Sequence, residues 1–274
     1  MRKLLDFVKF EHTLFSLPLL LAGAVLGAGG WPPVMPLVWI LVAGTGARTL
    51  AMALNRILDR DIDARNPRTA SRELPSGRMT LGAAIAVALI GLAMFVGAVL
   101  ALPPLCLKLL PIPLAIFVLY PLMKRFTPLA HFGVGAGLGF GPIGAYVAVT
   151  NSVLPFGPVH LLAIFTWLWV AGFDIIYATL DLEFDRREGL RSIPAAVGRT
   201  AALRVAAVVH VVAFGVLAWL TIGWLSGPLA LVALAAVGTL LAVEHWQAHR
   251  VDLAFFRINA VLGFVVLALV MVGI

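Results

Sequence analysis

The sequence is poor in charge and in cysteine. Only 12% of its 274 residues are Asp, Glu, Lys or Arg, about half of the share in an ordinary soluble domain. The single cysteine, Cys106, excludes an internal disulfide and a cysteine-rich metal site. Hydrophobic residues make up 62% of the chain, and a water-soluble core of this size could not bury so much apolar surface. The composition therefore predicts a polytopic membrane protein.

Apolar segments long enough to cross a bilayer recur along the whole chain. A spanning helix needs about 20 apolar residues, and nine such segments can be delimited: 12–30, 34–57, 80–101, 104–122, 128–150, 159–181, 199–223, 227–246 and 253–273. Proline and glycine mark the joints in "WPP", "LPP", "LPFGP" and "LSGP". Because no long linker interrupts them, we expect one all-α domain over residues 1–274. Its nine transmembrane helices should surround a central cavity that opens to the cytoplasmic side.

Charge is confined to alternate connections. The loops near residues 30–35, 101–104, 150–158 and 223–228 carry no charge, whereas nearly all charge lies near residues 58–79, 123–128, 182–200 and 244–252. Basic loops of membrane proteins stay in the cytoplasm, so the net charge of +7 indicates topology and no nucleic-acid partner. We expect the N-terminus and the charged loops in the cytoplasm and the C-terminus outside, in the cell (inner) membrane.

A first row of polar residues runs along the second predicted helix, in "GTGARTLAMALNRILDRDID". Arg48, Asn55, Asp59 and Asp63 are spaced by seven, four and four residues, which places them on one helical face. Asp61 points elsewhere. Since acidic residues contribute little to orientation, this row needs an explanation other than topology.

A second row occurs in the sixth predicted helix, in "GFDIIYATLDLEFDRREG". Asp174, Tyr177, Asp181 and Asp185 are spaced by three, four and four residues, again on one face. Asp174 lies several residues inside the apolar span, where a carboxylate is costly and usually functional.

Two facing rows of carboxylates can enclose a divalent cation. Ligands that are all oxygen suit Mg²⁺, which shares its coordination with substrate phosphates, so the rows predict Mg²⁺ and a diphosphate. For either row alone, pairing with neighbouring arginines is an equally good explanation; both together favour the metal. Basic residues at the same end of the predicted helices as the two rows are candidate ligands for the diphosphate; these are Lys9, Arg72, Lys124 and Arg125.

Two further polar residues are candidates for substrate contact. Arg48 belongs to the first row, at its membrane-embedded end, and Asn259 lies in the last predicted span. A hydrogen bond between helices explains Asn259 equally well.

At these residues the sequence resembles the UbiA superfamily of intramembrane prenyltransferases. "NRILDRDID" resembles the first aspartate-rich motif of that family, usually Asn-Asp-x-x-Asp-x-x-x-Asp, and "DLEFD" resembles the second, Asp-x-x-x-Asp. "RTASRELPSG" is similar to the loop after the first motif, and "YPLMKRFTPLAHFGVG" to the basic motif after the fourth helix. "FFRINA" near Asn259 also has the family pattern, and the resemblance covers nearly the whole chain.

The resemblance implies a Mg²⁺-dependent transfer of a polyprenyl group from an allylic polyprenyl diphosphate to a small aromatic acceptor in quinone biosynthesis. It implies that Lys124, Arg125 and Arg72 cradle the diphosphate, and that the metal is held by Asn55, Asp59, Asp63, Asp181 and Asp185. Asp174 and Tyr177 are then the catalytic candidates that orient the acceptor or take its proton, although ordinary packing explains Tyr177 equally well.

Departures from the family pattern leave the acceptor open. Arg56 replaces the usual Asp after Asn55, Glu73 stands where Pro is frequent, and His131 stands where Gln is frequent. These variants resemble the 4-hydroxybenzoate polyprenyltransferase branch and, within it, members of the futalosine pathway to menaquinone. The acceptor is then 4-hydroxybenzoate or aminodeoxyfutalosine, with 1,4-dihydroxy-2-naphthoate, haem or a lipid alcohol as alternatives.

Two other classes of membrane protein fit the pattern less well. A secondary transporter keeps its ionisable residues near the midplane, in broken helices of inverted repeats, whereas here they gather at one end. A CDP-alcohol phosphotransferase has one contiguous D-x-x-D-G-x-x-A-R segment, which is absent from this sequence. The oligomeric state is left open.

Overall fold

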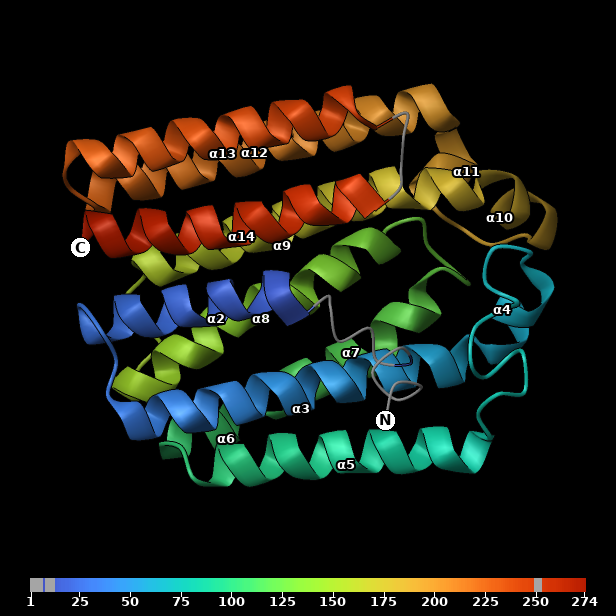
Figure 1. Cartoon of the computed structure of the whole chain (residues 1–274), viewed down its shortest axis with the longest axis horizontal. Helices are drawn as coiled ribbons and strands as arrows, with labels where there is room; N and C mark the ends of the chain where they lie inside the picture. The colour runs from blue at the N-terminus through green and yellow to red at the C-terminus, as the bar shows by residue number, and fades with distance from the viewer. Residues whose placement is uncertain (1–6, 8–12, 249–252) are drawn as a thin grey trace.

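The computed structural model describes residue 7, residues 13–248 and residues 253–274, and all regular elements in these residues are helices (Figure 1). The longer helices are α2 (Thr13–Ala28), α3 (Val34–Leu58), α5 (Leu81–Leu100), α7 (Pro111–Met123), α8 (Ala130–Thr150), α9 (Pro158–Ala178), α12 (Arg199–Trp224), α13 (Pro228–Trp246) and α14 (Leu253–Gly273). The shorter elements are α4 (Arg60–Arg65), α6 (Pro104–Leu109), the 3₁₀ turn η2 (Thr179–Asp181), α10 (Leu182–Glu188) and α11 (Ile193–Val197). Lys9, a predicted diphosphate ligand, lies outside the described residues.

The all-α prediction is confirmed, and each predicted span coincides with helical structure. Among the described residues, seven helices are long and apolar enough to cross a membrane when α6 is joined to α7 and α9 to α10. The shorter apolar helices at residues 16–28 and 257–273 coincide with the first and last predicted spans. That all nine segments cross the bilayer stays a prediction, as does the side on which a cavity opens.

Proline determines where several helices begin. Pro104, Pro158 and Pro228 lie in the first turn of α6, α9 and α13, where the missing N–H costs no hydrogen bond. The fourth predicted span, 104–122, corresponds to one candidate membrane span, Pro104–Met123, but its helix is interrupted at Leu110, and Pro111 starts α7. A proline within a helix removes a backbone hydrogen bond and clashes with the preceding turn, which explains the break.

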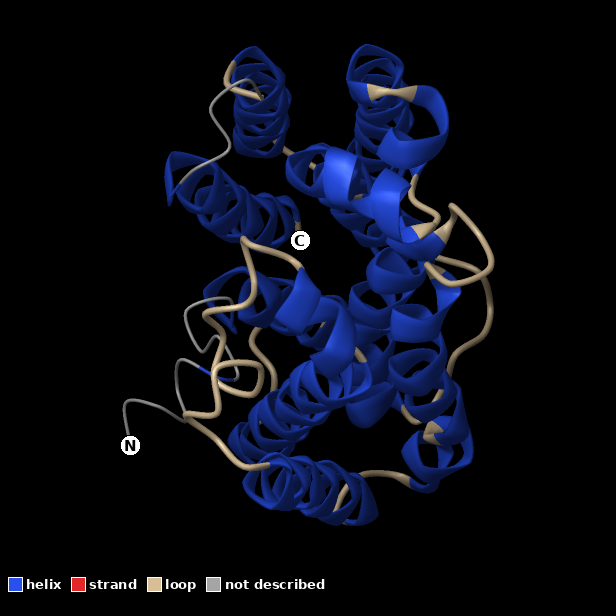
Figure 2. Ribbon diagram, turned by 90° about the vertical axis from the view of Figure 1, so that its right-hand side faces the viewer, coloured by secondary structure: helices blue, strands red, loops and turns tan. Residues whose placement is uncertain are grey.

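Helix α9 forms the centre of the bundle. It packs between α8 and α12, while α2 packs on α8 and α14, and α3 packs on α5 and α7; Figure 2 shows these helices nearly end-on. Phe165 and Trp169 of α9 are fully buried, with their rings stacked 5.8 Å apart. Among the candidate membrane spans of the described residues, the helix that carries the second acidic row is the most deeply buried.

The short elements gather at one end of the bundle. Figure 1 shows α4, α10 and α11 side by side at the right-hand end of the long helices. These elements belong to the two longest charged connections, 58–79 and 182–200. The two acidic rows therefore reach the same end of the molecule, as the charge pattern predicts.

Glycine permits the close approach of α3 and α5. A Cβ added at Gly91 would lie 2.7 Å from the backbone nitrogen of Leu50 and 3.0 Å from the carbonyl oxygen of Gly46. Such a contact involves backbone, which cannot move aside as a flexible side chain can.

We therefore expect Gly91→Ala to lower the stability of the folded protein by about 1–3 kcal/mol, because α5 must move away from α3. Gly97→Ala on the same helix is the matched control, since its Cβ would meet nothing within 4 Å. Thermal unfolding in detergent, followed by tryptophan fluorescence, compares the two. Equal midpoints for both variants would contradict the backbone contact.

Candidate active site

Both acidic rows bend at their first motif aspartate, so neither lies on one regular α-helix, although α9, η2 and α10 follow one another without a gap. Helix α3 ends at Leu58, Asp59 follows with φ −97° and ψ 3°, and Asp63 lies on α4. In the second row Asp181 has φ −101° and ψ 4° at the end of η2, and Asp185 lies on α10. The two bends have nearly the same backbone geometry.

Asp59 is a buried carboxylate with one oxygen engaged. Its Oδ2 lies 2.7 Å from the Nζ of Lys124 and accepts a 3.2 Å hydrogen bond from the Nδ2 of Asn55. Its Oδ1 is buried and has no hydrogen-bond partner among the described residues. Burial raises the pKa of Asp59 above the ordinary value of an aspartate, and the ion pair with Lys124 opposes that shift. An oxygen of this kind is suited to receive a further cation.

Asp63 is held by two arginines. Arg72 places its Nη1 2.8 Å from both carboxylate oxygens, and the Nη1 of Arg56 lies 3.9 Å from Oδ2. Arg56 is 4% exposed, and its Nε and Nη1 have no hydrogen-bond partner in the described part of the chain. A buried guanidinium with unpaired donors favours an anion nearby.

Asp181 of the second row is bound by the loop that follows the first row. The guanidinium of Arg68 contacts both of its oxygens, with 2.8 Å between Nε and Oδ1, and Asn66 donates to Oδ1 at 2.8 Å. Arg68 also donates to the hydroxyl oxygen of Tyr177 at 3.1 Å. Burial acts to lower the pKa of Arg68, but its bonds to Asp181 outweigh this and the net shift is upward. Neither Arg68 nor Asn66 is among the residues predicted from the sequence.

Asp185 and Arg125 connect further segments to the same region. The hydroxyl of Ser192 donates to the Oδ2 of Asp185 at 2.8 Å, and Lys124 lies close enough to interact electrostatically with this carboxylate. Arg125 donates to the carbonyl oxygen of Leu58 at the end of α3, at 2.7 Å. Lys124 therefore lies between the two rows, since Asp59 and Asp185 belong to different ones.

Asp174 lies on α9, seven residues before Asp181 and therefore about two helical turns deeper. Its Oδ2 is 2.6 Å from the Nδ1 of His131, which lies in the first turn of α8 and is 4% exposed. The side chain of Asp174 keeps 28% of its surface exposed. In Asp174, the predicted catalytic aspartate, one carboxylate oxygen is therefore held by His131 while part of the side chain stays accessible.

Arg48 and Asn259, the two further residues predicted to contact substrate, lie in different surroundings. Arg48 lies on α3 about three turns from Asp59, close enough to interact with Tyr120, whose hydroxyl donates to the carbonyl of Ala51 at 3.4 Å. Asn259 accepts a bond from the Nε1 of Trp169 at 3.0 Å and donates to Glu244 at 3.1 Å. These bonds join α14 to α9 and α13, which is the interhelical role that the sequence left open for Asn259.

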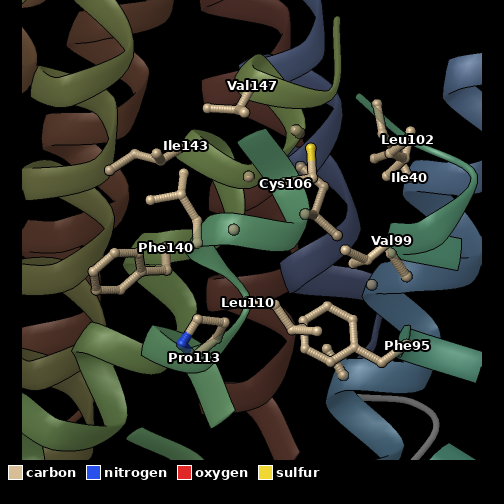
Figure 3. A pocket seen from close by; sticks show the side chains of 18 of the residues that line it. Ile40, Phe95, Val99, Leu102, Cys106, Leu110, Pro113, Phe140, Ile143 and Val147 are labelled. Atoms are coloured by element: carbon tan, nitrogen blue, oxygen red, sulfur yellow. The ribbon is translucent and has the colours of Figure 1, made fainter. Parts of the chain in front are cut away.

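An apolar pocket lies beside α3, the helix on which the first row begins. Figure 3 shows Phe95 and Val99 of α5, Cys106 of α6 and Phe140 and Ile143 of α8 around it. Ala47 of α3, the residue before Arg48, is also part of its lining. The pocket therefore approaches the acidic rows at the level of Arg48, and its wall offers almost only hydrocarbon.

The two rows meet, but their carboxylates are held apart by cations. Within residues 13–248 and 253–274, no three His, Cys, Asp or Glu side chains lie close enough together to hold a metal ion. Three carboxylates of the rows form ion pairs: Asp59 with Lys124, Asp63 with Arg72, and Asp181 with Arg68. The site is therefore a set of carboxylate and amide oxygens with basic side chains between them. An apolar pocket begins at its membrane-embedded end, near Arg48.

Comparison with known proteins gives one consistent match. Residues 16–255 match the UbiA prenyltransferase family. The 4-hydroxybenzoate octaprenyltransferase of Burkholderia multivorans is 34% identical over 276 residues, which cover 96% of this chain and 93% of that protein. The enzyme of the same name from Shewanella sediminis is 34% identical over 190 residues, and this match spans only 65% of its length.

Solved structures share the fold. A UbiA homolog from Aeropyrum pernix K1, in its apo form, superposes with a TM-score of 0.87 and 34% identity, covering 96% of this chain and 98% of the other. A UbiA homolog from Archaeoglobus fulgidus bound to GPP and Mg²⁺ has a TM-score of 0.71 and covers 99% of this chain and all of its own. With 15% identity, the second likeness shows the fold alone.

Proposed function

Because the chain belongs to the UbiA prenyltransferase family, we propose that it transfers a polyprenyl group from an allylic polyprenyl diphosphate to an aromatic acceptor in quinone biosynthesis. The acceptor is 4-hydroxybenzoate, as in the names of its relatives, or aminodeoxyfutalosine, with 1,4-dihydroxy-2-naphthoate as the alternative. The reaction takes place at the cytoplasmic end of the bundle in the cell membrane.

The observation that carries this proposal is the bond between Arg68 and Asp181. It ties the loop after the first acidic row to the second row, so carboxylates from two distant segments share one site. Lys124 adds a cation that forms an ion pair with Asp59 of the first row and interacts electrostatically with Asp185 of the second. A site with alternating carboxylates and basic side chains favours a ligand that carries both charges: a metal ion for the carboxylates and an anion for the basic side chains. A metal-bound diphosphate is such a ligand.

The donor set fits Mg²⁺ in its chemistry. The candidate ligands are oxygen atoms without a thiolate or imidazole, which is what a hard divalent cation prefers, and Asp59 presents a buried oxygen without a partner. The ligands that would hold the ion are Asn55, Asp59, Asp63, Asp181 and Asp185. The Archaeoglobus fulgidus homolog, of the same fold, was solved with Mg²⁺, which supports this choice of metal.

Three of these ligands, Asp59, Asp63 and Asp181, are paired with basic side chains, so a metal can reach them only if those side chains find another anion. The diphosphate provides it: Arg68, Arg72 and Lys124 would exchange a carboxylate for a phosphate oxygen, which a guanidinium binds through two N–H groups. Arg125 lies beside Lys124 in the same segment. Substrate and metal binding should therefore be mutually dependent.

In the reaction, the bond between the allylic carbon and the diphosphate oxygen breaks, and both electrons leave with pyrophosphate. The chemistry that Mg²⁺ supplies when bound is Lewis-acid neutralisation of that charge. The cations Arg68, Arg72 and Lys124 stabilise the same developing charge from fixed positions. The acceptor's ring carbon provides the electron pair of the new C–C bond, and its proton passes to a base, for which Asp174 is the candidate. Tyr177, tied to Arg68, orients the substrates.

The apolar pocket suits the isoprenoid tail. Its lining is almost entirely hydrocarbon, so it excludes water from the allylic end and protects carbocation character there. Gly144 lines this pocket, and a Cβ at this position would meet nothing within 4 Å.

We expect Gly144→Phe to raise the KM for polyprenyl diphosphates by about 10-fold, because the ring occupies space that the tail needs. The effect should be smaller for a diphosphate with a single isoprene unit. Gly215→Phe on α12 is the control, as its Cβ also meets nothing within 4 Å but it is no part of the pocket lining. An equal relative change in KM for long and short diphosphates in the Gly144 variant would remove the tail from this pocket.

The experiment that tests the function offers purified protein, Mg²⁺ and labelled polyprenyl diphosphates of several lengths to 4-hydroxybenzoate, aminodeoxyfutalosine and 1,4-dihydroxy-2-naphthoate. Mass spectrometry of the products identifies the acceptor and the tail together. A protein that binds the diphosphates but prenylates none of the acceptors would end the proposal for an aromatic substrate.

A further inference from the structure

The contact between His131 and Asp174 has a definite direction. The backbone N–H of Ile193 donates to the Nε2 of His131 at 3.4 Å, so Nε2 must carry the lone pair. The proton of a neutral ring then lies on Nδ1, and Nδ1–H donates to the Oδ2 of Asp174 across 2.6 Å. The imidazole thus satisfies both of its nitrogens while Asp174 accepts as a carboxylate.

His131 is held rigidly by its surroundings. Its side chain is 5% exposed, and its partner Ile193 begins α11, directly after the N-cap residue Ser192. The hydroxyl of Ser192 accepts from the N–H of Ala195 at 3.2 Å and donates to Asp185. One short segment therefore fixes both His131 and a carboxylate of the second row.

Asp174 is constrained on one side only. Its Oδ2 is bound to His131, while 28% of the side-chain surface is exposed, and it lies close enough to Tyr120 to interact with that phenol electrostatically. Tyr120 in turn interacts with Asp59 and Arg48. Asp174 therefore faces the region between α3, α7 and α9, inward of the carboxylates proposed to hold the metal.

We propose that His131 is a positioning residue for Asp174: it holds the carboxylate so that the free oxygen takes the proton from the prenylated ring carbon of the acceptor. The inference rests on the proposed function. In this step the C–H bond of the ring carbon breaks, its electron pair restores the aromatic ring, and the proton binds Asp174. By donating to Oδ2, His131 keeps this side chain in one rotamer and leaves the other oxygen for the proton.

The test compares His131→Met with His131→Gln, two unbranched side chains of similar length. Gln offers an N–H to Asp174 and a carbonyl to the N–H of Ile193, whereas Met offers neither. We expect His131→Met to lower turnover about 10- to 100-fold and His131→Gln to restore most of it. Binding of a non-hydrolysable thio-diphosphate analogue should be unchanged in both variants, because neither alters the cations of the site.

A kinetic isotope effect separates positioning from mere packing. With ring-deuterated acceptor, the wild-type protein should show little effect, and His131→Met a larger primary effect, since proton removal becomes the slow step. When Asp174→Asn is already present, His131→Met should lower turnover little further, because the carboxylate that His131 positions has already been removed. An isotope effect that stays at the wild-type value, or full additivity of the two substitutions, would overturn the proposal.

A measurement on the unmodified protein keeps the proposal testable even when a variant does not fold. In ¹⁵N-histidine-labelled protein, the imidazole of His131 should show the tautomer protonated at Nδ1, assigned by its loss in His131→Gln or, if that variant does not fold, by its through-space coupling to the backbone N–H of Ile193. The tautomer protonated at Nε2 would contradict the inference. Failure of the wild-type protein to prenylate any acceptor would instead remove the proposed function, so the two failures are distinguishable.

Discussion

Asp59→Asn is expected to lower kcat/KM for prenyl transfer by about 10²-fold or more, comparable with the loss of one fixed charge-stabilising group at a reacting centre. The substitution keeps the size of the side chain but removes the negative charge from the buried oxygen that has no partner. An amide oxygen is a weaker ligand for Mg²⁺ than a carboxylate. Initial rates measured over a range of Mg²⁺ concentrations should show a higher metal requirement as well as a lower maximum.

Asp61→Asn is the matched control for this prediction. Asp61 lies two residues further on, its side chain is 76% exposed, and it pairs with Arg60, whose side chain is 46% exposed. The same change of charge in the same segment should leave the rate within about twofold, because an exposed ion pair contributes little. Equal losses in the two variants would indicate a general effect of charge on the loop, and full activity of Asp59→Asn would remove Asp59 from the metal site.

A loss of activity in Asp59→Asn could also come from a disturbed Lys124, since the two side chains form an ion pair at 2.7 Å. Binding of Mn²⁺, followed by electron paramagnetic resonance, distinguishes these causes. Weaker Mn²⁺ binding together with unchanged thermal stability would assign the loss to the metal. Lower stability with intact Mn²⁺ binding would assign it to Lys124.

The fold could be predicted from the sequence because the bilayer requires it. In lipid a spanning segment must satisfy its own backbone hydrogen bonds, so about 20 apolar residues leave little choice but a helix. The segments 34–57 and 80–101 therefore match α3 and α5 closely. The break at Leu110 was missed because the spacing of apolar residues does not reveal how a proline within the span is accommodated.

The position of the acidic rows could be predicted, but their shape could not. Spacings of four residues identify Asp59 with Asp63 and Asp181 with Asp185 as pairs. The bend at each first aspartate depends on where the long helix ends, and helix ends depend on tertiary contacts such as the bond from Arg125 to the carbonyl of Leu58. Such a contact joins residues 67 positions apart and leaves no local sequence signal.

Arg68 was missed for a related reason. Arg65, Arg68 and Arg72 follow each other in one basic loop, and the tendency of basic residues to stay in the cytoplasm explains all three equally well. Only the path of the loop decides that Arg68 reaches Asp181, Arg72 reaches Asp63 and Arg65 reaches Glu188. The pattern thus identified a basic loop, and the structure assigns each arginine its carboxylate.

Arg68→Gln is expected to raise the KM for the polyprenyl diphosphate and to lower kcat/KM by about 10²-fold, since a bidentate cation is lost from the site of charge development. Arg68→Lys should fall between Gln and the wild type, because it keeps the charge but not the planar fork. Arg65→Gln is the control: Arg65 ends α4 three residues before Arg68, also pairs with an acid, at 2.7 Å, and is 53% exposed against 31% for Arg68.

The direction of the metal dependence decides what Arg68 does. If Arg68 only neutralised Asp181 until a metal arrives, its removal would strengthen Mg²⁺ binding and leave turnover intact. If it moves to the diphosphate when the metal takes its carboxylate, as we propose, turnover and substrate binding fail together even at saturating Mg²⁺. Arg68 contacts both Asp181, a proposed metal ligand, and Tyr177, which is proposed to orient the substrates. The second outcome would therefore also show that one side chain couples metal binding to the positioning of the substrates.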